Sequence, residues 1–258
     1  MENVTEYPYN TLMKNRKIRV FEYPDQLVDY AIGKWSDMSE DAIEKRGLFT
    51  VALSGGSTPV YFYKKLSGIN LNWNKTHIFI VDERFVPFDH RDSNVRMMHE
   101  TLLGNVDIPE KNIHSVTTEK GRADEAAHSY ESDIVSFFKL SSGALPEFDL
   151  ILLGLGYDGH TASLFPGSSA LTVDDRLAVS VTPPDGSMHD RVSITFPVIN
   201  NARNILFFIT GSKKAEVVKD VLENEDSTLP ASSVKPRQGK LIYLLDRQAG
   251  ALLSGSTR

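Results

Sequence analysis

The residue types best suited to chemistry lie directly after an unbroken apolar run, residues 150–153, where the chain has the triplet Asp158-Gly159-His160. Histidine exchanges a proton near neutral pH, and a neighbouring carboxylate can fix which ring nitrogen carries that proton. We therefore predict that Asp158 orients His160 and that the other ring nitrogen takes a proton from water. The alternative is a structural histidine, hydrogen-bonded at the start of a helix.

A second polar segment, Asp82-Glu83-Arg84, follows the apolar residues 78–81. The Arg84 guanidinium can bind an anion or stabilise a developing oxyanion. In the alternative interpretation, Glu83 and Arg84 form an exposed ion pair, and Asp92 or Ser93 only caps the following helix. Because Asp82 directly follows apolar residues, we expect this segment to point into the same crevice as the histidine.

The third segment, Ser54-Gly55-Gly56-Ser57-Thr58-Pro59, joins a predicted strand to a predicted helix. Its glycines allow close approach of the backbone, Ser57 or Thr58 can cap the helix, and Pro59 suits the first helical turn. The free N–H groups and the positive end of the helix would hold one phosphate group. No Gly-Lys-Ser/Thr follows, so we do not expect nucleoside triphosphate hydrolysis. An ordinary strand-to-helix turn is the alternative interpretation.

The segment around the histidine also contains Gly154-x-Gly156-x-x-Gly159, which after a strand resembles a dinucleotide-binding fingerprint. That fingerprint should open a full helix, whereas Phe165-Pro166-Gly167 breaks the chain within two turns. The motif also lies far from the first predicted strand-helix-strand unit. We therefore reject dinucleotide binding.

Apolar segments alternate along the chain with segments of helical periodicity. The predicted strands are residues 17–21, 49–53, 77–81, 148–153, 191–196, 204–209 and 240–245. The predicted helices begin near Asp25, Val60, Ser93, Ala123 and Ala215, and a short closing helix spans residues 248–253. This alternation predicts an α/β fold with an open, mostly parallel sheet and helices on both faces, a three-layer sandwich. The carboxyl ends of parallel strands share one edge, so the three polar segments should meet there.

Composition narrows the function classes. The 258 residues are 41% hydrophobic and 24% charged with a net charge of -6, so the chain has no basic field that would favour nucleic acid. It has no cysteine, which excludes a thiolate nucleophile and suits a reducing compartment. The sequence has no apolar run of transmembrane length, and its first residues lack the apolar core of a signal peptide. We expect a cytoplasmic protein without a membrane partner.

Histidines outside the motif are scattered without the spacing typical of metal ligands. His90, with Asp89 and Asp92, could trap a stray divalent ion, but the sequence contains no closed zinc site. We therefore expect no metal. Since the sequence contains neither an internal repeat nor a clear linker, we predict one α/β catalytic domain, residues 17–258, after an N-terminal extension, residues 1–16.

The ordered motifs together resemble those of the glucosamine-6-phosphate isomerase/6-phosphogluconolactonase superfamily, and within it those of the lactonases. The similarity extends over nearly all of the chain after the extension, with small departures at Val95 and Tyr243, where the family often has an aromatic residue and Trp. The matching blocks are residues 54–59, 82–87, 92–94 and 158–166, with further similarity at 191–195, 211–214 and 230–234.

The resemblance implies hydrolysis of 6-phosphoglucono-1,5-lactone to 6-phosphogluconate in the pentose phosphate pathway, without a cofactor. It implies that His160 is the general base, that Asp158 orients it, and that Arg84 stabilises the tetrahedral intermediate. The implied substrate-binding residues are Ser54, Gly55, Gly56, Ser57, Thr58, Asp82, Glu83, Arg191 and Lys213, of which the glycine loop, Lys213 and Arg191 would hold the phosphate. The partner is then a small sugar-phosphate lactone, and the chain is expected to be a monomer or a weak homo-oligomer.

Two other functions are compatible with the same motifs. An aldose-ketose isomerase or deaminase of an amino-sugar phosphate would share the phosphate loop and the Asp-Gly-His triplet. Deaminase relatives carry an Asn-Glu-Pro ending where this chain has Ser163-Leu164-Phe165-Pro166, and the missing glutamate favours lactone hydrolysis. A non-catalytic sugar-phosphate sensor would keep the phosphate loop but would not require His160.

Overall fold

The computed structural model describes residues 4–6, 16–119, 121–184, 186 and 189–254. Its centre is an eight-stranded sheet of order β1-β2-β11-β10-β7-β3-β4-β6, and all neighbouring pairs except β1 with β2 are parallel. The strands of this sheet are β1 (Val4–Glu6), β2 (Arg16–Phe21), β3 (Phe49–Leu53), β4 (Thr76–Ile80), β6 (Ile113–His114), β7 (Leu150–Leu153), β10 (Asn204–Ile209) and β11 (Lys240–Asp246). The predicted open, mostly parallel sheet is confirmed.

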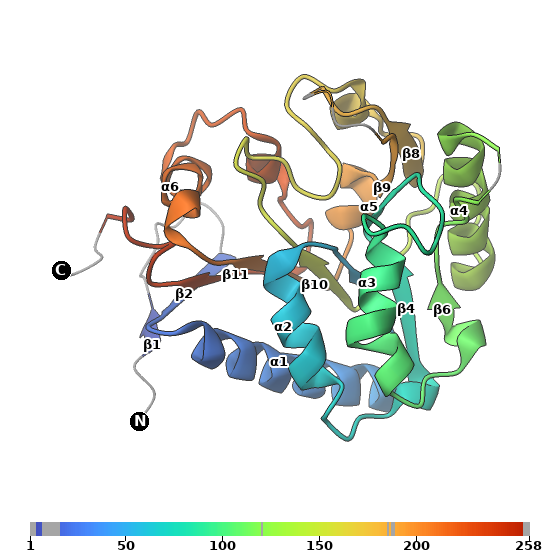
Figure 1. The fold of residues 1–258 in the computed structure, drawn as a ribbon, viewed down its shortest axis with the longest axis horizontal. Coiled ribbons are helices and arrows are strands. Elements are labelled where there is room, and N and C mark those ends of the chain that lie inside the picture. Colours follow the sequence, from blue (N-terminus) through green and yellow to red (C-terminus); the bar gives the residue numbers. More distant parts are fainter. Residues whose placement is uncertain (1–3, 7–15, 120, 185, 187–188, 255–258) are drawn as a thin grey trace.

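Helices cover both faces of this sheet, with α1 on one side and α6 on the other (Figure 1). The α-helices are α1 (Pro24–Arg46), α2 (Ser57–Leu66), α3 (Asn94–Thr101), α4 (Ala123–Phe138), α5 (Phe196–Ile199) and α6 (Ala215–Glu223). Short 3-10 turns lie at Trp73–Lys75, Leu103–Asn105, Glu110–Asn112, Ser169–Thr172, Ser212–Lys214 and Pro230–Ser233. Among the helices that the structure describes, none is both long and apolar enough to cross a membrane.

The strands bury both faces because their side chains alternate between two apolar cores. Along β10, Ile205, Phe207 and Ile209 pack in the core under α4, α5 and α6. Leu206 and Phe208, between them, pack in the core under α1, α2 and α3. This division into sheet and two helical layers confirms the predicted three-layer sandwich.

A second, three-stranded sheet of order β5-β9-β8 differs from the expectation. It consists of β5 (Asp82–Arg84), β8 (Ala178–Val181) and β9 (Arg191–Ile194), all paired antiparallel. The sequence predicted β5 as a loop and did not predict β8. Both strands are short, and their pairing with β9 depends on partners distant in the chain, so local sequence carries little signal for them.

Other predicted elements also differ from the structure. The strand predicted at 191–196 stops at Ile194, and α5 begins at Phe196. The segment predicted as a closing helix, residues 248–253, forms turns that are held by separate hydrogen bonds from Gly250 N to Asp246 O and from Leu253 N to Gly250 O. Gly250 destabilises a helix in this short segment, so a continuous series of helical backbone hydrogen bonds does not form.

The expected N-terminal extension, residues 1–16, contributes β1, which pairs antiparallel with β2 at the edge of the sheet. Residues 1–3 and 7–15 of this segment lie outside the described residues. The boundary of the predicted domain at residue 17 and its organisation as a single domain stay predictions.

The aromatic contact between α2 and the sheet provides a test of what holds this helix in place. Phe62 of α2 is 1% exposed, and its ring centroid lies 5.0 Å from that of Phe208 and 6.1 Å from that of Trp35. We expect Phe62→Ala to lower the free energy of unfolding by about 3–5 kcal/mol, because it leaves a cavity under the helix. Urea unfolding measures this change. The matched control is Tyr61→Ala on the exposed side of α2, which should change it by less than about 1 kcal/mol.

Candidate active site

Four neighbouring strands of the central sheet, β10, β7, β3 and β4, end at the same edge. The polar segments singled out in the sequence follow three of them: Ser54 follows β3, Asp82 follows β4, and Gly154 follows β7. Thr210 follows the fourth, β10. Ligands of open α/β sheets bind beyond the carboxyl ends of the strands. The topology therefore brings the predicted segments together, as the sequence required.

A cavity of about 280 Å³ opens at this edge. Its lining includes the glycine loop after β3, the polar end of β4, the turn that carries the histidine, and the start of the segment after β10. The lining residues that matter for chemistry are Ser54, Gly55, Gly56, Ser57, Thr58, Asp82, Arg84, Asn94, His160 and Lys214. The described lining does not include four residues that the sequence analysis expected at the site, Asp158, Glu83, Arg191 and Lys213.

The histidine and the aspartate of the triplet are in direct contact. His160 Nδ1 lies 2.5 Å from Asp158 Oδ1, and the same oxygen accepts a hydrogen bond from the His160 backbone N–H at 3.2 Å. An ionised carboxylate can only accept, so this contact favours the tautomer with the proton on Nδ1. The lone pair of Nε2 is then free to take a proton, and the ring is 32% exposed. Asp158 thus contacts the imidazole at Nδ1 and is not among the residues that line the cavity.

The turn that carries this pair is closed by Gly156, whose N–H donates to His160 O at 2.8 Å. A Cβ atom at Gly156 would lie 2.2 Å from His160 Nδ1 and 2.6 Å from Asp158 Oδ1, so only glycine leaves room for the pair. Gly159 has φ +82, a conformation that favours glycine. Within the segment that resembles a dinucleotide fingerprint, Gly156 thus leaves room for an imidazole and a carboxylate, and Gly159 allows the turn between them.

Arg84 lies at the end of β5 and lines the cavity. Its Nη1 donates to the backbone oxygen of Asp92 at 2.7 Å, which fixes the guanidinium. Among the described residues, none accepts a hydrogen bond from its buried Nε. A buried donor without a partner is uncommon, and a water molecule or a ligand oxygen can supply the missing acceptor. Asp82, next to it, accepts a hydrogen bond from Ser163 Oγ at 2.7 Å.

Glu83 has a different environment from the one expected of a substrate-binding residue. It is 1% exposed, and its carboxylate accepts hydrogen bonds from the backbone N–H groups of Arg84, Asn94 and Val95 at 2.7–2.8 Å and from Ser93 Oγ at 3.2 Å. Burial raises the pKa of Glu83, and the backbone hydrogen bonds oppose that rise. Its carboxylate thus caps the first turn of α3 and ties this helix to β5.

The glycine loop after β3 leads into α2, whose N-cap is Gly56 with φ +108. A Cβ atom at Gly55 would lie 1.9 Å from Asn94 Oδ1, so the loop and the start of α3 approach closely. Asn94 donates from Nδ2 to Asp82 O at 2.7 Å and lines the cavity. Asn94 belongs to one of the blocks that match the family, but it was not among the site residues expected from the sequence.

Lys214, and not the predicted Lys213, is the lysine at the cavity. Its Nζ donates to Leu155 O at 2.5 Å and lies 3.5 Å from the centroid of the Tyr157 ring. Partial burial lowers the pKa of Lys214, and the nearby Asp158 carboxylate opposes that shift. Lys213 is exposed.

Arg191, at the start of β9, pairs with Arg84 in the β5–β9 register.

A larger groove, of about 1310 Å³, lies at the opposite edge of the sheet, where β2, β10 and β11 begin. Its lining includes Lys17, Arg46, Arg203 and Lys240, with Asp149 among them. The residues singled out in the sequence analysis are at the other edge. We therefore assign the candidate active site to the smaller cavity, where an imidazole, a guanidinium and a glycine loop converge.

Comparisons with known proteins show the family of the chain. The family model described as "Glucosamine-6-phosphate isomerases/6-phosphogluconolactonase" matches residues 22–243. A 6-phosphogluconolactonase of Synechocystis is 47% identical over 211 residues, which are 81% of this chain and 86% of that protein. Among solved structures, 6-phosphogluconolactonase from Trypanosoma cruzi superposes with a TM-score of 0.85 at 29% identity, covering 95% of this chain and all of that one. The Trypanosoma brucei enzyme gives 0.83 at 31% identity, covering 92% and 98%.

The contact between Asp158 and His160 predicts which ring nitrogen carries the proton. For neutral His160 in the parent chain, long-range 1H–15N NMR spectra should show the Nδ1–H form. In Asp158→Ala, the Nε2–H form should dominate, because it is the more stable form of an imidazole without a partner. His128 is the internal reference, because its Nδ1 lies 2.6 Å from a backbone oxygen that can only accept. An unchanged tautomer in the variant would contradict the assigned role of Asp158.

Proposed function

Because the chain belongs to the glucosamine-6-phosphate isomerase/6-phosphogluconolactonase family, we propose that it hydrolyses 6-phosphoglucono-1,5-lactone to 6-phosphogluconate in the pentose phosphate pathway. The observation that carries the proposal is the convergence of His160, Arg84 and the glycine loop around one cavity. Ester hydrolysis needs a base for water, a donor for the oxyanion and a fixed substrate, and each of these three groups can supply one.

In the proposed first step, Nε2 of His160 takes a proton from a water molecule, and the water oxygen attacks the lactone carbonyl carbon. The Asp158 carboxylate, 2.5 Å from Nδ1, stabilises the imidazolium that results. The carbonyl oxygen gains the negative charge of the tetrahedral intermediate. The Arg84 guanidinium is the donor proposed for this charge, since its Nε is not used by the described residues. A fixed donor of this kind stabilises the transition state more than the ground state.

In the second step, the intermediate collapses and the bond between the carbonyl carbon and the ring oxygen breaks. His160 returns the proton from its Nε2 to this ring oxygen, which becomes a hydroxyl group. One water is consumed, the ring opens, and the imidazole regains its neutral form. The product is the open-chain acid.

The phosphate group is proposed to bind at the start of α2, on the backbone of Gly55 and Gly56 and the hydroxyls of Ser57 and Thr58. Thr58 Oγ1 already lies 3.2 Å from Thr210 Oγ1, which fixes one of these hydroxyls. A helix N-terminus favours an anion through its free N–H groups and its dipole. Lys214 replaces Lys213 as the proposed cation, because it is the lysine that lines the cavity.

The role of His160 is tested by His160→Ala. We expect a loss of roughly 10²- to 10⁴-fold in turnover, because the general base is removed, while 6-phosphogluconate still binds. Turnover is measured by following lactone consumption, with the spontaneous opening in buffer subtracted. The matched control is His128→Ala on the exposed face of α4, which should keep the parent rate. A parent chain that binds 6-phosphogluconate without turnover above the blank would instead be a sugar-phosphate sensor.

The adjacent lysines give a matched pair for the phosphate site. Lys214→Ala should raise KM for the phosphorylated lactone by about 10-fold or more, which corresponds to ~1.4 kcal/mol of lost binding. Lys213→Ala should leave KM within about 2-fold of the parent value, because the Lys213 side chain is exposed and Lys214 still lines the cavity. Steady-state kinetics of both variants decide the assignment. A larger rise in KM for Lys213→Ala than for Lys214→Ala would instead assign Lys213 to the phosphate site.

A further inference from the structure

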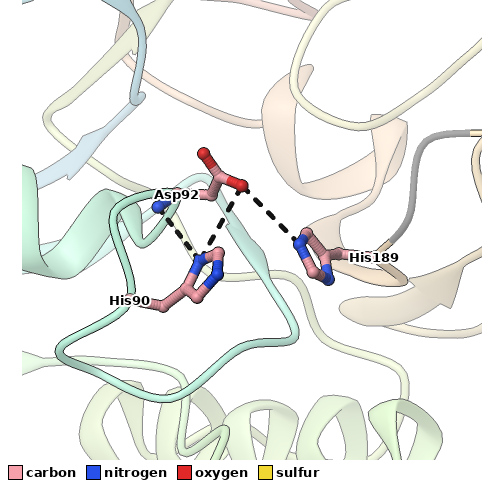
Figure 2. A group of neighbouring side chains, drawn as sticks. All are labelled: His90, Asp92 and His189. Atoms are coloured by element: carbon pink, nitrogen blue, oxygen red, sulfur yellow. Dashed lines mark hydrogen bonds and ion pairs between the residues drawn. The ribbon is translucent and has the colours of Figure 1, made fainter.

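His90, Asp92 and His189 converge outside the cavity described above (Figure 2). His90 Nδ1 lies 3.8 Å and His189 Nε2 3.6 Å from the same oxygen, Asp92 Oδ2. One ligand atom from each of the three residues lies within 4.8 Å of the other two. His90 and Asp92 lie in the loop between β5 and α3, and His189 shortly precedes the partner of β5, strand β9.

These donors are chemically suited to a divalent transition metal. Imidazole nitrogen binds Zn²⁺ well, and a carboxylate oxygen completes many three-ligand zinc sites. Zinc bonds of ~2.0–2.2 Å in tetrahedral geometry place ligand atoms about 3.4 Å apart. The separations from Asp92 Oδ2, 3.6 and 3.8 Å, are close to this value, and all three ligand atoms lie within 4.8 Å of one another, so side-chain rotations have to bring the imidazoles onto a common ion.

The hydrogen bonds around the cluster leave its ligand atoms available. No described residue forms a hydrogen bond with the buried Nε2 of His189. The contacts of the Asp92 carboxylate with His90, His189 and the exposed Arg91 are all 3.6–3.9 Å long, beyond hydrogen-bond length. His90 Nδ1 accepts one bond of 3.2 Å from the Asp92 N–H, which a metal bond would replace.

We propose that His90, Asp92 and His189 bind one divalent transition-metal ion, with Zn²⁺ as the ion of choice. The three side chains are 35%, 40% and 23% exposed, so water can reach a fourth coordination position. The ion joins the loop before α3 to the segment before β9. Arg84 binds the backbone oxygen of Asp92 and not its carboxylate, so metal binding and the proposed hydrolysis use different atoms of this residue.

Zinc binding to the purified full-length chain tests this site. Metal is removed with a chelator, the chelator is removed, and Zn²⁺ is titrated against a competing chelator of known affinity. We expect one tightly bound ion per chain. His90→Ala, His189→Ala and Asp92→Asn should each weaken binding by about 100-fold or more, since even groups that only orient metal ligands contribute about 10- to 100-fold.

Two control variants distinguish the cluster from histidines elsewhere in the chain. His128→Ala removes an exposed histidine of α4, and His160→Ala removes the histidine of the candidate active site; both should bind Zn²⁺ like the parent. Thermal unfolding provides a second measurement: Zn²⁺ should raise Tm of the parent and of both controls but not of the three cluster variants. Circular dichroism without metal confirms that each variant is folded.

The proposal is overturned if the cluster variants bind Zn²⁺ as tightly as the parent, or if the parent binds only several weak ions per chain. It is also overturned if His160→Ala abolishes binding while His90→Ala retains it, because the ion would then lie in the cavity. Since none of these readouts uses lactone hydrolysis, failure of the metal site leaves the proposed function untouched, and the reverse also holds.

Discussion

The buried carboxylate of Glu83 is the interaction on which the geometry of the site depends. Placing a carboxylate in a buried position is costly, and here three backbone N–H groups and a hydroxyl offset that cost. Two of those N–H groups belong to Arg84 and Asn94, which both line the cavity. The same carboxylate fixes the start of α3 and hence one end of the loop that carries His90 and Asp92. A residue outside the cavity lining therefore positions groups that can reach a ligand.

The parts of the site that the sequence predicted well are those built from neighbouring residues. Asp158 and His160 are two residues apart in one turn, so their contact needs little from the rest of the fold. The glycine loop leads into a helix, as the order of residue types indicated, but α2 begins at Ser57 with Gly56 as its N-cap, so the expected cap at Ser57 or Thr58 was wrong. The unbroken apolar runs of the strands are local features of the sequence. Their side chains alternate between the two cores, so these runs are enough to predict a sheet covered on both faces.

The parts that the sequence could not predict depend on partners distant in the chain. Nothing local distinguishes Lys213 from Lys214; the short 3-10 turn at Ser212–Lys214 decides which side chain faces the cavity. The sequence places Glu83 among the substrate-binding residues or in an exposed ion pair, because its hydrogen-bond donors Asn94 and Val95 are distant in the chain. His189 joins His90 and Asp92 only through the antiparallel pairing of β5 with β9, a pairing between segments about which the sequence carried little signal.

The close contacts at Gly55 and Gly156 have a consequence for how this cavity can evolve. Neither glycine has the left-handed φ of Gly56 or Gly159, so its backbone would accept other residues. What excludes a side chain is the neighbour: Asn94 over Gly55, and His160 over Gly156. A new methyl group at either position therefore has to be accompanied by a shorter side chain opposite. The steric order of changes is therefore fixed: a shorter side chain at Asn94 or His160 has to come before any residue larger than glycine at the position opposite.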